Sequence, residues 1–495
     1  MKNKKNKKKF LNKNQKSFYF QDYIETSLNQ KNHSKSLISD DRIYLMFFVF
    51  FCLISIFSIK IIFLSIQDPK LLNGKREIQY FLPLRRDIVD RNDEILSRNI
   101  KTYHAAIRPS LIKDKDKFLI NIKLHFPNIS QEFLKKKLSD NKYFYLKKRL
   151  TAKEKDKLYF LGEKGIIFEP FQSRIYPHSE LYSHILGQID DDNYGISGIE
   201  KTFDKKLKSN KNSMALTLDT NLQFLIREEL IKFQKIFNNI GSTSILMDIN
   251  NGEILSLVSL PDFDLNKRET IQSSNYINRA TKGVYELGSV FKTFTLAGAL
   301  NEGLLDTNTK FKNLPKQISC AGRPIGEYDD KIPKDLTAEQ ILIRSGNIGS
   351  VRIGQKIGIK KMQNFLNNLG LNNKIEFDIE EVGNPLPFKW GKCKLATASF
   401  GHGITTTPLQ LAKGYSIISN GGFIIKPTLV KNEIKENNKN RILKKGVSEK
   451  INTILRKIVS TKEGTANFAN IDGYEVGGKT GTAQKSFNGV YTKNK

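Results

Sequence analysis

The sequence predicts a membrane-anchored protein with two domains outside the membrane, an α+β domain followed by an α/β domain. Three observations predict this fold class. One long apolar run lies near the N-terminus, a Lys-rich stretch of mixed strand and helix patterns follows it, and a helix with a strand hairpin begins near residue 213. A chain of 495 residues is long enough for two such domains, each with its own core.

The apolar run at residues 43–66, IYLMFFVFFCLISIFSIKIIFLSI, is long enough for one membrane-spanning helix, which needs about 20 residues. Lys60 lies near one end, where its aliphatic stem lets the charge reach the interface. The run is too long and begins too late for a cleaved signal peptide. The Lys-rich tail at residues 1–42 predicts that the N-terminus is cytoplasmic and that the chain after the helix is periplasmic.

The net charge of +31 is typical of a protein that binds an anionic partner. Lysine and asparagine are spread along the whole chain, which indicates a compositional bias, and we expect no nucleic acid partner because no binding module is recognisable. The histidines show no metal-ligand spacing, so we expect neither a metal nor a cofactor. Cys52 falls in the apolar run, whereas Cys320 and Cys393 could pair outside the membrane, although sequence does not show that they are close.

The first predicted domain covers residues 67–212. Asp90–Asp93 reads as a turn between two strand-like pieces. Residues 110–165 are Lys-rich and compatible with helices, and an irregular, glycine-punctuated region follows them.

The second predicted domain covers residues 213–495. It opens with a helix that a Thr/Asp cluster caps, and then with two apolar strands around Asn251-Gly252, a strong hairpin signal. The apolar residues predicted to share one face of that helix are Leu222, Ile226, Leu230, Phe233 and Phe237.

Three short motifs in this second domain carry candidate chemistry. Ser289 and Lys292 lie one helical turn apart, so a buried lysine of depressed pKa could accept the serine proton. Ser-x-x-Lys alone is a weak signal. Ser345-Gly346-Asn347 adds a hydroxyl and an amide at the end of a helical pattern, and Lys479-Thr480-Gly481-Thr482 adds a cation on a strand-like segment.

The three motifs, in this order, resemble those of the penicillin-recognising serine acyltransferases. The anchor and the stretches LPLRRDIVDRND and GISGIEKTFDKKL are similar to class B penicillin-binding proteins, although Asp87 and Asp93 stand where the family usually has glycine. YELGSVFK and SFGHGITTTPLQLAKGYS look more like the septal, FtsI-like type. The resemblance implies a pedestal domain and then a penicillin-binding transpeptidase domain, an antiparallel sheet with helices on both faces.

This resemblance implies a peptidoglycan D,D-transpeptidase of cell division. Ser289 would attack a stem peptide, Lys292 would be the base, and β-lactams would acylate Ser289. The residues that carry over are catalytic Ser289, Lys292, Ser345 and Asn347, and substrate-binding Lys479, Thr480, Gly481 and Thr482. Implied partners are stem peptides, the lipid-linked precursor, β-lactams, a membrane glycosyltransferase of the FtsW type and other division proteins, all at the bacterial inner membrane.

Several alternatives stay open at this point. Glu380 and Asn384 have the spacing of a β-lactamase motif, and His402 could be a base, although we expect it to be structural. An elongation-type transpeptidase, a β-lactam sensor and a non-catalytic binding partner are the other readings.

Only 13 residues, 483–495, follow Thr482, whereas the family has further strands after Lys-Thr-Gly. We therefore expect the last strands of the sheet to be missing from a truncated domain, which leaves the activity of the 495-residue chain uncertain.

Overall fold

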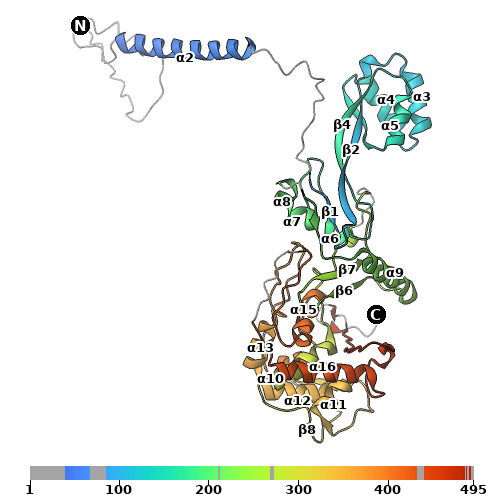
Figure 1. Cartoon of the computed structure of the whole chain (residues 1–495), viewed down its shortest axis with the longest axis vertical. Coiled ribbons are helices and arrows are strands. Elements are labelled where there is room, and N and C mark those ends of the chain that lie inside the picture. Colours follow the sequence, from blue (N-terminus) through green and yellow to red (C-terminus); the bar gives the residue numbers. More distant parts are fainter. Residues whose placement is uncertain are drawn as a thin grey trace, which may run out of the picture. The chain divides into compact units, whose positions relative to one another are not determined.

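The computed structural model describes residues 40–66, 85–209, 212–267, 273–431, 440–484, 486–487 and 490–491 (Figure 1). The chain divides into two compact units, residues 1–79 and 80–495. Residues 1–39 of the Lys-rich tail and residues 67–84 lie outside the described residues, so the structure does not test the predictions made for them.

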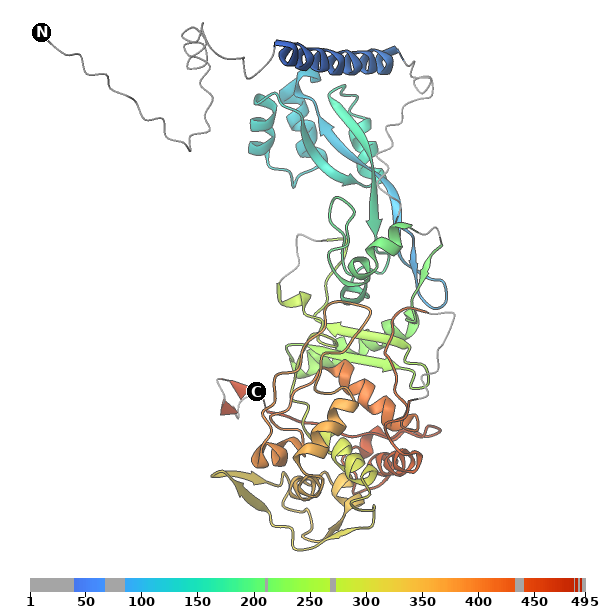
Figure 2. The same cartoon turned by 90° about the vertical axis from the view of Figure 1, so that its left-hand side faces the viewer.

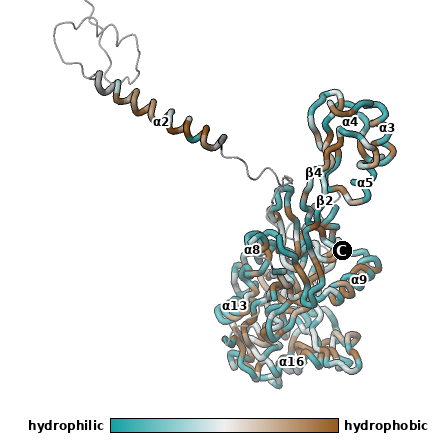
Figure 3. The backbone as a smooth tube through the Cα atoms, turned by 45° about the horizontal axis from the view of Figure 1, so that its top comes forward, coloured by the Kyte–Doolittle hydropathy of each residue, from teal (hydrophilic) through white to brown (hydrophobic). Residues whose placement is uncertain are grey.

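The described part of the first unit is one long helix, α2, over Asp40–Ile66. Its central stretch, Tyr44–Phe63, has a mean hydropathy of 2.6 and none of it is buried in the protein. Figure 3 shows this helix as an almost continuously hydrophobic segment. The apolar helix predicted from the sequence is confirmed, and by length and composition it is able to cross a membrane.

The second unit begins with the pedestal, whose sheet is organised around one long strand, β2 (Figure 1). Strand order is β3-β2-β1-β5, and β4 also pairs with β2; all pairings are antiparallel except that of β1 with β5. The strands are β1 Ile88–Val89, β2 Ile95–Ile107, β3 Phe144–Leu150, β4 Ile166–Ile175 and β5 Met214–Ala215. The helices are α3 Lys115–His125, α4 Gln131–Ser139, α5 Ala152–Tyr159, α6 Ser183–Leu186, α7 Gly198–Thr202 and α8 Asp204–Ser209.

The sequence suggested helices for residues 110–165, but the segment is not purely helical. Strand β3 separates α4 from α5. Phe144, Leu146 and Leu150 are buried at even spacing, which is the pattern of a strand that covers one side of a core. This alternation of apolar residues was not recognised in the sequence because the segment is rich in lysine.

The predicted turn at Asp90–Asp93 is confirmed, and it connects β1 to β2. The Asp90 carboxylate accepts hydrogen bonds from the backbone N–H groups of Asn92 and Glu94, at 2.7 and 2.9 Å. Asp93 has a φ of 66°. Since aspartate is one of the few side chains that tolerate this left-handed region, it can stand where the family usually has glycine.

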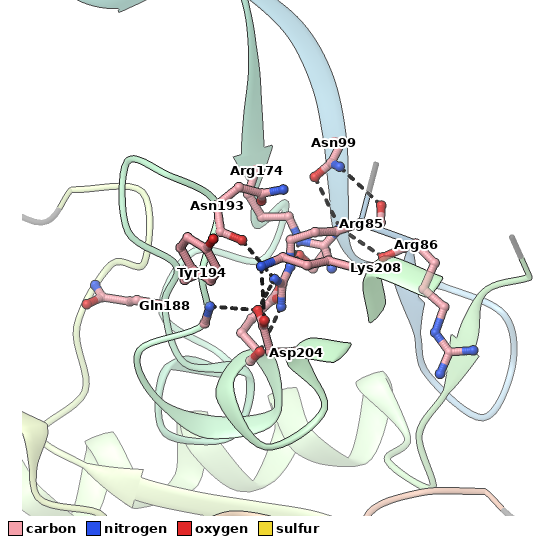
Figure 4. Close-up of polar contacts among 12 residues, drawn as sticks. Arg85, Arg86, Asn99, Arg174, Gln188, Asn193, Tyr194, Asp204 and Lys208 are labelled. Atoms are coloured by element: carbon pink, nitrogen blue, oxygen red, sulfur yellow. Dashed lines mark hydrogen bonds and ion pairs between the residues drawn. The ribbon is translucent and has the colours of Figure 1, made fainter. Parts of the chain in front are cut away.

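A cluster of charges, three of them fully buried, holds the base of the pedestal together (Figure 4). The Glu200 carboxylate binds Arg85 Nη2 and Arg174 Nε, each at 2.7 Å, and all three side chains have no exposed surface. Asp204 on α8 also pairs with Arg85. Lys208 also pairs with Asp204, at 3.0 Å, so three cations face two anions and each charge that leaves water keeps a partner of opposite sign.

The second domain opens as predicted, with a capped helix and a hairpin. Helix α9, Thr220–Phe237, begins where the Asp219 side chain accepts two backbone N–H bonds, and β6 Ser242–Met247 pairs antiparallel with β7 Ile254–Leu260. The expected single buried apolar face is wrong at one end, because Phe233 and Phe237 are 48% and 69% exposed. The contact with β7 is instead made around buried Gln223, which donates to the Leu257 carbonyl.

The rest of the domain is mainly helical (Figure 2). Helix α10 is at its centre, with residues 291–300 all buried. The helices are α10 Phe291–Asn301, α11 Ala338–Ile343, α12 Asn347–Ile357, α13 Ile359–Asn368, α14 Lys392–Ala398, α15 Pro408–Ser419 and α16 Lys445–Ser460. The short strands are β8 Lys310–Phe311 with β11 Leu336–Thr337, β9 Gln317–Cys320 with β10 Arg323–Gly326, and β12 Ser486–Phe487 with β13 Val490–Tyr491.

Two features of this domain became apparent only in the structure. Cys320 and Cys393 form a disulfide that ties β9 to α14, with their Cα atoms 5.6 Å apart. Within the described residues, the sheet that opens the domain consists of β6 and β7 alone, and residues 479–484 form no strand, contrary to the strand-like pattern seen in the sequence. A segment without a neighbouring strand cannot form a ladder.

Candidate active site

Ser289 lies in a tight 3-10 turn, η4 Gly288–Val290, that leads directly into α10. The turn is enclosed by two backbone segments. A Cβ atom on Gly288 would lie 2.1 Å from the Thr482 carbonyl oxygen, and one on Gly401 would lie 1.9 Å from the Gly288 carbonyl oxygen. Glycine is therefore required at both positions, and the turn that carries Ser289 lies against the Lys-Thr-Gly segment.

Lys292 is the second residue of α10 and is only 1% exposed. Its Nζ donates hydrogen bonds to the Ser345 carbonyl oxygen at 2.6 Å, to Ser345 Oγ at 3.2 Å and to Asn347 Oδ1 at 2.6 Å. The loop between α11 and α12 thus meets the first turn of α10, as the joint occurrence of the two motifs in the sequence suggested.

Lys479 reaches the same hydroxyl from the other side. Its Nζ donates to Ser345 Oγ at 2.9 Å and to the Thr480 carbonyl oxygen at 2.9 Å. The Thr480 hydroxyl donates to Thr465 Oγ1. Gly481 packs so closely on the turn that carries Ser289 that a Cβ atom on it would lie 2.6 Å from the Leu287 carbonyl oxygen. All three sequence motifs therefore meet around Ser345.

Two amines that lie beside one another, buried Lys292 and partly buried Lys479, differ from free lysines in acidity. Burial lowers the pKa of Lys292 well below its ordinary value of 10.5, and the nearby Lys479 cation lowers it further, against a smaller opposing effect of Glu327. Burial lowers the pKa of Lys479 to about 8. Such an arrangement favours a neutral amine at Lys292, next to a cation at Lys479.

Tyr415 on α15 supports the turn that carries Ser289, a role that was not predicted from the sequence. Its hydroxyl donates to the Val290 carbonyl oxygen at 3.0 Å and lies 2.9 Å from Thr293 Oγ1. Complete burial raises the pKa of Tyr415, which keeps the phenol neutral. No local pattern marks this tyrosine, because its role depends on α15 packing against α10.

Glu380 and His402, the alternatives considered in the sequence, make the following contacts. The Glu380 carboxylate pairs with Lys201 Nζ of the pedestal at 2.7 Å. The His402 ring packs 5.0 Å from the Phe400 ring, and burial lowers the pKa of His402. That His402 is structural remains a prediction.

The assembled groups are those of acyl transfer. A serine at the start of a buried helix, an amine of depressed pKa and nearby backbone N–H groups are able to supply a nucleophile, a base and stabilisation of an oxyanion. Among the residues that the structure describes, no three His, Cys, Asp or Glu side chains gather as a metal site would require.

Comparison with known proteins agrees with this geometry. The family model of the penicillin binding protein transpeptidase domain matches residues 242–495, slightly more than half of the chain. The model of the penicillin-binding protein dimerisation domain matches residues 81–232 in front of it. The chain therefore belongs to the penicillin-binding proteins, as a class B member with both domains, and the family predicted from the sequence is confirmed.

Several named relatives are similar over most of the chain. A probable peptidoglycan D,D-transpeptidase FtsI of Caulobacter vibrioides is 29% identical over 409 residues, which cover 81% of this chain and 69% of the relative. The probable peptidoglycan D,D-transpeptidase PenA of Neisseria meningitidis is 28% identical over 84% of this chain and 76% of the relative. The peptidoglycan D,D-transpeptidase FtsI of Buchnera aphidicola is 28% identical over 92% and 87%.

Proposed function

We propose that the chain is a peptidoglycan D,D-transpeptidase that forms an acyl-enzyme on Ser289 during cell division. The observation that carries the proposal is the convergence of Lys292 and Lys479 on the Ser345 hydroxyl, beside the turn that bears Ser289. Membership of the transpeptidase family and the names of the FtsI relatives support the same reaction.

In the first half of the reaction, neutral Lys292 takes the proton of Ser289, and Ser289 Oγ attacks the carbonyl carbon of the penultimate D-alanine of a stem peptide. The backbone N–H groups of Ser289 and Thr482 stabilise the oxyanion. The bond to the terminal D-alanine breaks, and the leaving amine takes up a proton that Ser345 relays. The burial of Lys292, which favours its neutral form, supports its role as base.

The remaining motif residues hold the substrate. The Asn347 amide binds a backbone amide of the stem peptide, and the Lys479 cation with the hydroxyls of Thr480 and Thr482 binds its terminal carboxylate. Gly481 keeps this segment against the nucleophile turn. A β-lactam, which resembles the terminal dipeptide, acylates Ser289 in the same position.

In the second half of the reaction, the side-chain amine of a neighbouring stem peptide attacks the acyl-enzyme. The new amide bond cross-links the two strands, and the proton of the amine returns through Lys292 to Ser289. Neither half of this cycle requires a cofactor.

We also propose that α2 anchors the chain in the bacterial inner membrane with the N-terminus in the cytoplasm, and that a glycosyltransferase of the FtsW type supplies the strands to be cross-linked. The apolar helix and the Lys-rich tail support this orientation. External protease on spheroplasts should digest residues after α2 and leave a tag on the N-terminus intact; loss of the N-terminal tag would contradict this orientation.

Fluorescent penicillin labelling of the purified chain tests the proposed function. We expect covalent label on the wild-type protein and none on Ser289→Ala, with equal melting temperatures. Absence of Ser289-dependent label would reject catalytic competence of this chain.

A further inference from the structure

The loop that carries Ser345 and Asn347 is held by a residue that lies outside all three motifs. Helix α12 begins at Asn347, and the residue before it, Gly346, has no side chain that could accept the first N–H groups of the helix. The Glu327 carboxylate, which follows β10, accepts these bonds instead. The Asn347 N–H donates to Glu327 Oε2 at 2.6 Å, and the Ile348 N–H donates to Oε1 at 2.9 Å.

The neighbours of Glu327 hold the same loop. The Asn347 side-chain amide donates to the Gly326 carbonyl oxygen at 2.8 Å, and the Tyr328 hydroxyl donates to the Arg344 carbonyl oxygen at 3.0 Å. Three consecutive residues, 326–328, therefore contact the loop on both sides of Ser345. Ser345 itself has a φ of 56°, a strained conformation for serine that needs support from its surroundings.

We propose that Glu327 is a positioning residue for catalysis, which fixes Asn347 and Ser345 in register with Lys292; the proposal rests on the function proposed above. The Asn347 side chain is held at its amide nitrogen by Gly326 and offers its oxygen to Lys292 Nζ at 2.6 Å. When the first turn of α12 loses its carboxylate, this oxygen is free to move away from the lysine.

Glu327 also acts on Lys292 through its charge. The charged groups that face Lys292 are Lys479 from the Lys-Thr-Gly segment and Glu327 from the segment after β10, and His402 lies close enough for its pKa to be lowered by Lys292. Glu327 raises the pKa of Lys292, so its removal lowers that pKa. Since the base must be neutral, activity is lost as the pH falls through this pKa, and neutralising Glu327 moves the acid limb to lower pH.

The segment is well anchored for this task. The Glu327 N–H donates to the Lys316 carbonyl oxygen at 3.0 Å, next to the paired strands β9 and β10, and the Cys320–Cys393 disulfide ties β9 to α14. A carboxylate on so restrained a hairpin holds its partner more accurately than one on a free loop.

The test compares Glu327→Gln with Asp329→Asn in the full chain in detergent. Asp329 is a matched control because Asp329→Asn removes the same charge from the same segment. Its carboxylate accepts a hydrogen bond from the Lys331 N–H, whereas the first N–H groups of α12 donate to Glu327. We measure the rate of Ser289 acylation by fluorescent penicillin from pH 5 to pH 9, together with melting temperature and hydrogen exchange over residues 344–350.

For Glu327→Gln we expect acylation to fall about 10- to 100-fold, because small misplacement of catalytic groups has effects of that order. The acid limb should move to lower pH and residues 344–350 should exchange faster, whereas Asp329→Asn should change none of these. Glu327→Asp should recover part of the rate. Wild-type kinetics and exchange in Glu327→Gln, or a loss that only follows its unfolding with an unchanged pH profile, would overturn the inference. Lack of label on the wild type would instead reject the proposed function, and exchange alone would then decide whether Glu327 holds the loop.

Discussion

The protein buries charge in two places and in opposite ways. In the pedestal, Arg85 and Arg174 face Glu200 and Asp204, so each cation is paired with an anion (Figure 4). In the candidate active site, buried Lys292 and partly buried Lys479 lie beside the same hydroxyl, and their neighbours there are mainly uncharged oxygens.

The pKa values of the buried side chains differ between the two clusters accordingly. The pKa of Arg85 is raised, because Glu200 and Asp204 outweigh the effect of burial, whereas the pKa values of Lys292 and Lys479 are lowered by burial. Buried charges that are paired with opposite charges keep their ordinary state and hold a structure together, whereas like charges favour loss of a proton and create a reactive amine. The comparison predicts that mutations in the two clusters have different consequences.

The largest expected effect is that of Lys292→Met on acylation. Without its base, Ser289 should react with penicillin about 10²- to 10⁴-fold more slowly, the usual contribution of a general base. The melting temperature should stay close to that of the wild type, because the lost group was destabilised by its own burial. Stopped-flow labelling and thermal melting measure the two quantities.

Lys413→Met is the control for this variant. Burial also lowers the pKa of Lys413, but its Nζ lies near Gly370 rather than Ser345. Wild-type acylation in Lys292→Met, or equal losses in the two variants, would contradict the assignment of a base to the lysine cluster.

In the pedestal, Glu200→Ala should act on folding instead. Removal of this carboxylate leaves Arg85 and Arg174 buried without their shared partner, which should lower the free energy of unfolding by about 3–5 kcal/mol. Urea unfolding of the full chain in detergent measures it. Glu380→Ala, which removes an exposed partner of Lys201, should leave the midpoint unchanged. A Glu200→Ala protein as stable as the wild type would show that the cluster contributes no net stability.

A smaller effect is expected for the disulfide, which ties β9 to α14. Replacing Cys320 and Cys393 by serine opens a loop of 73 residues and should lower stability by about 2–4 kcal/mol. Acylation of the folded fraction should fall less than in Lys292→Met. Thermal melting of the wild type with and without reductant should give the same difference; no effect of reductant would mean that this disulfide does not restrain the unfolded chain.

The sequence predicts well whatever depends on neighbouring residues. The spacing of Ser289 and Lys292, the Asp219 cap of α9 and the hairpin around Asn251-Gly252 are all present in the fold. The family that they indicate is confirmed by the family models.

Features that depend on tertiary contacts could not be predicted in this way. Glu327 lies 20 residues before Asn347 and acts only because the hairpin β9–β10 packs on α12. The pairing of Cys320 with Cys393, the support from Tyr415 and the exposure of Phe237 have the same origin, since each depends on which elements come together in space. The domain boundaries at residues 66/67 and 212/213, and the roles of the individual site residues, remain predictions.

The pH profile of Ser289 acylation by penicillin tests the central claim, that a neutral Lys292 and a charged Lys479 form the site together. Lys292 must be neutral, so the rate should rise with pH and level off well below the ordinary lysine pKa of 10.5. Lys479 must be charged, so the rate should fall again as the pH passes about 8. A bell-shaped profile with its alkaline limb near pH 8 is the predicted result. A rate that rises steadily to pH 10 would contradict it, because it would mean that both lysines titrate as they do in water.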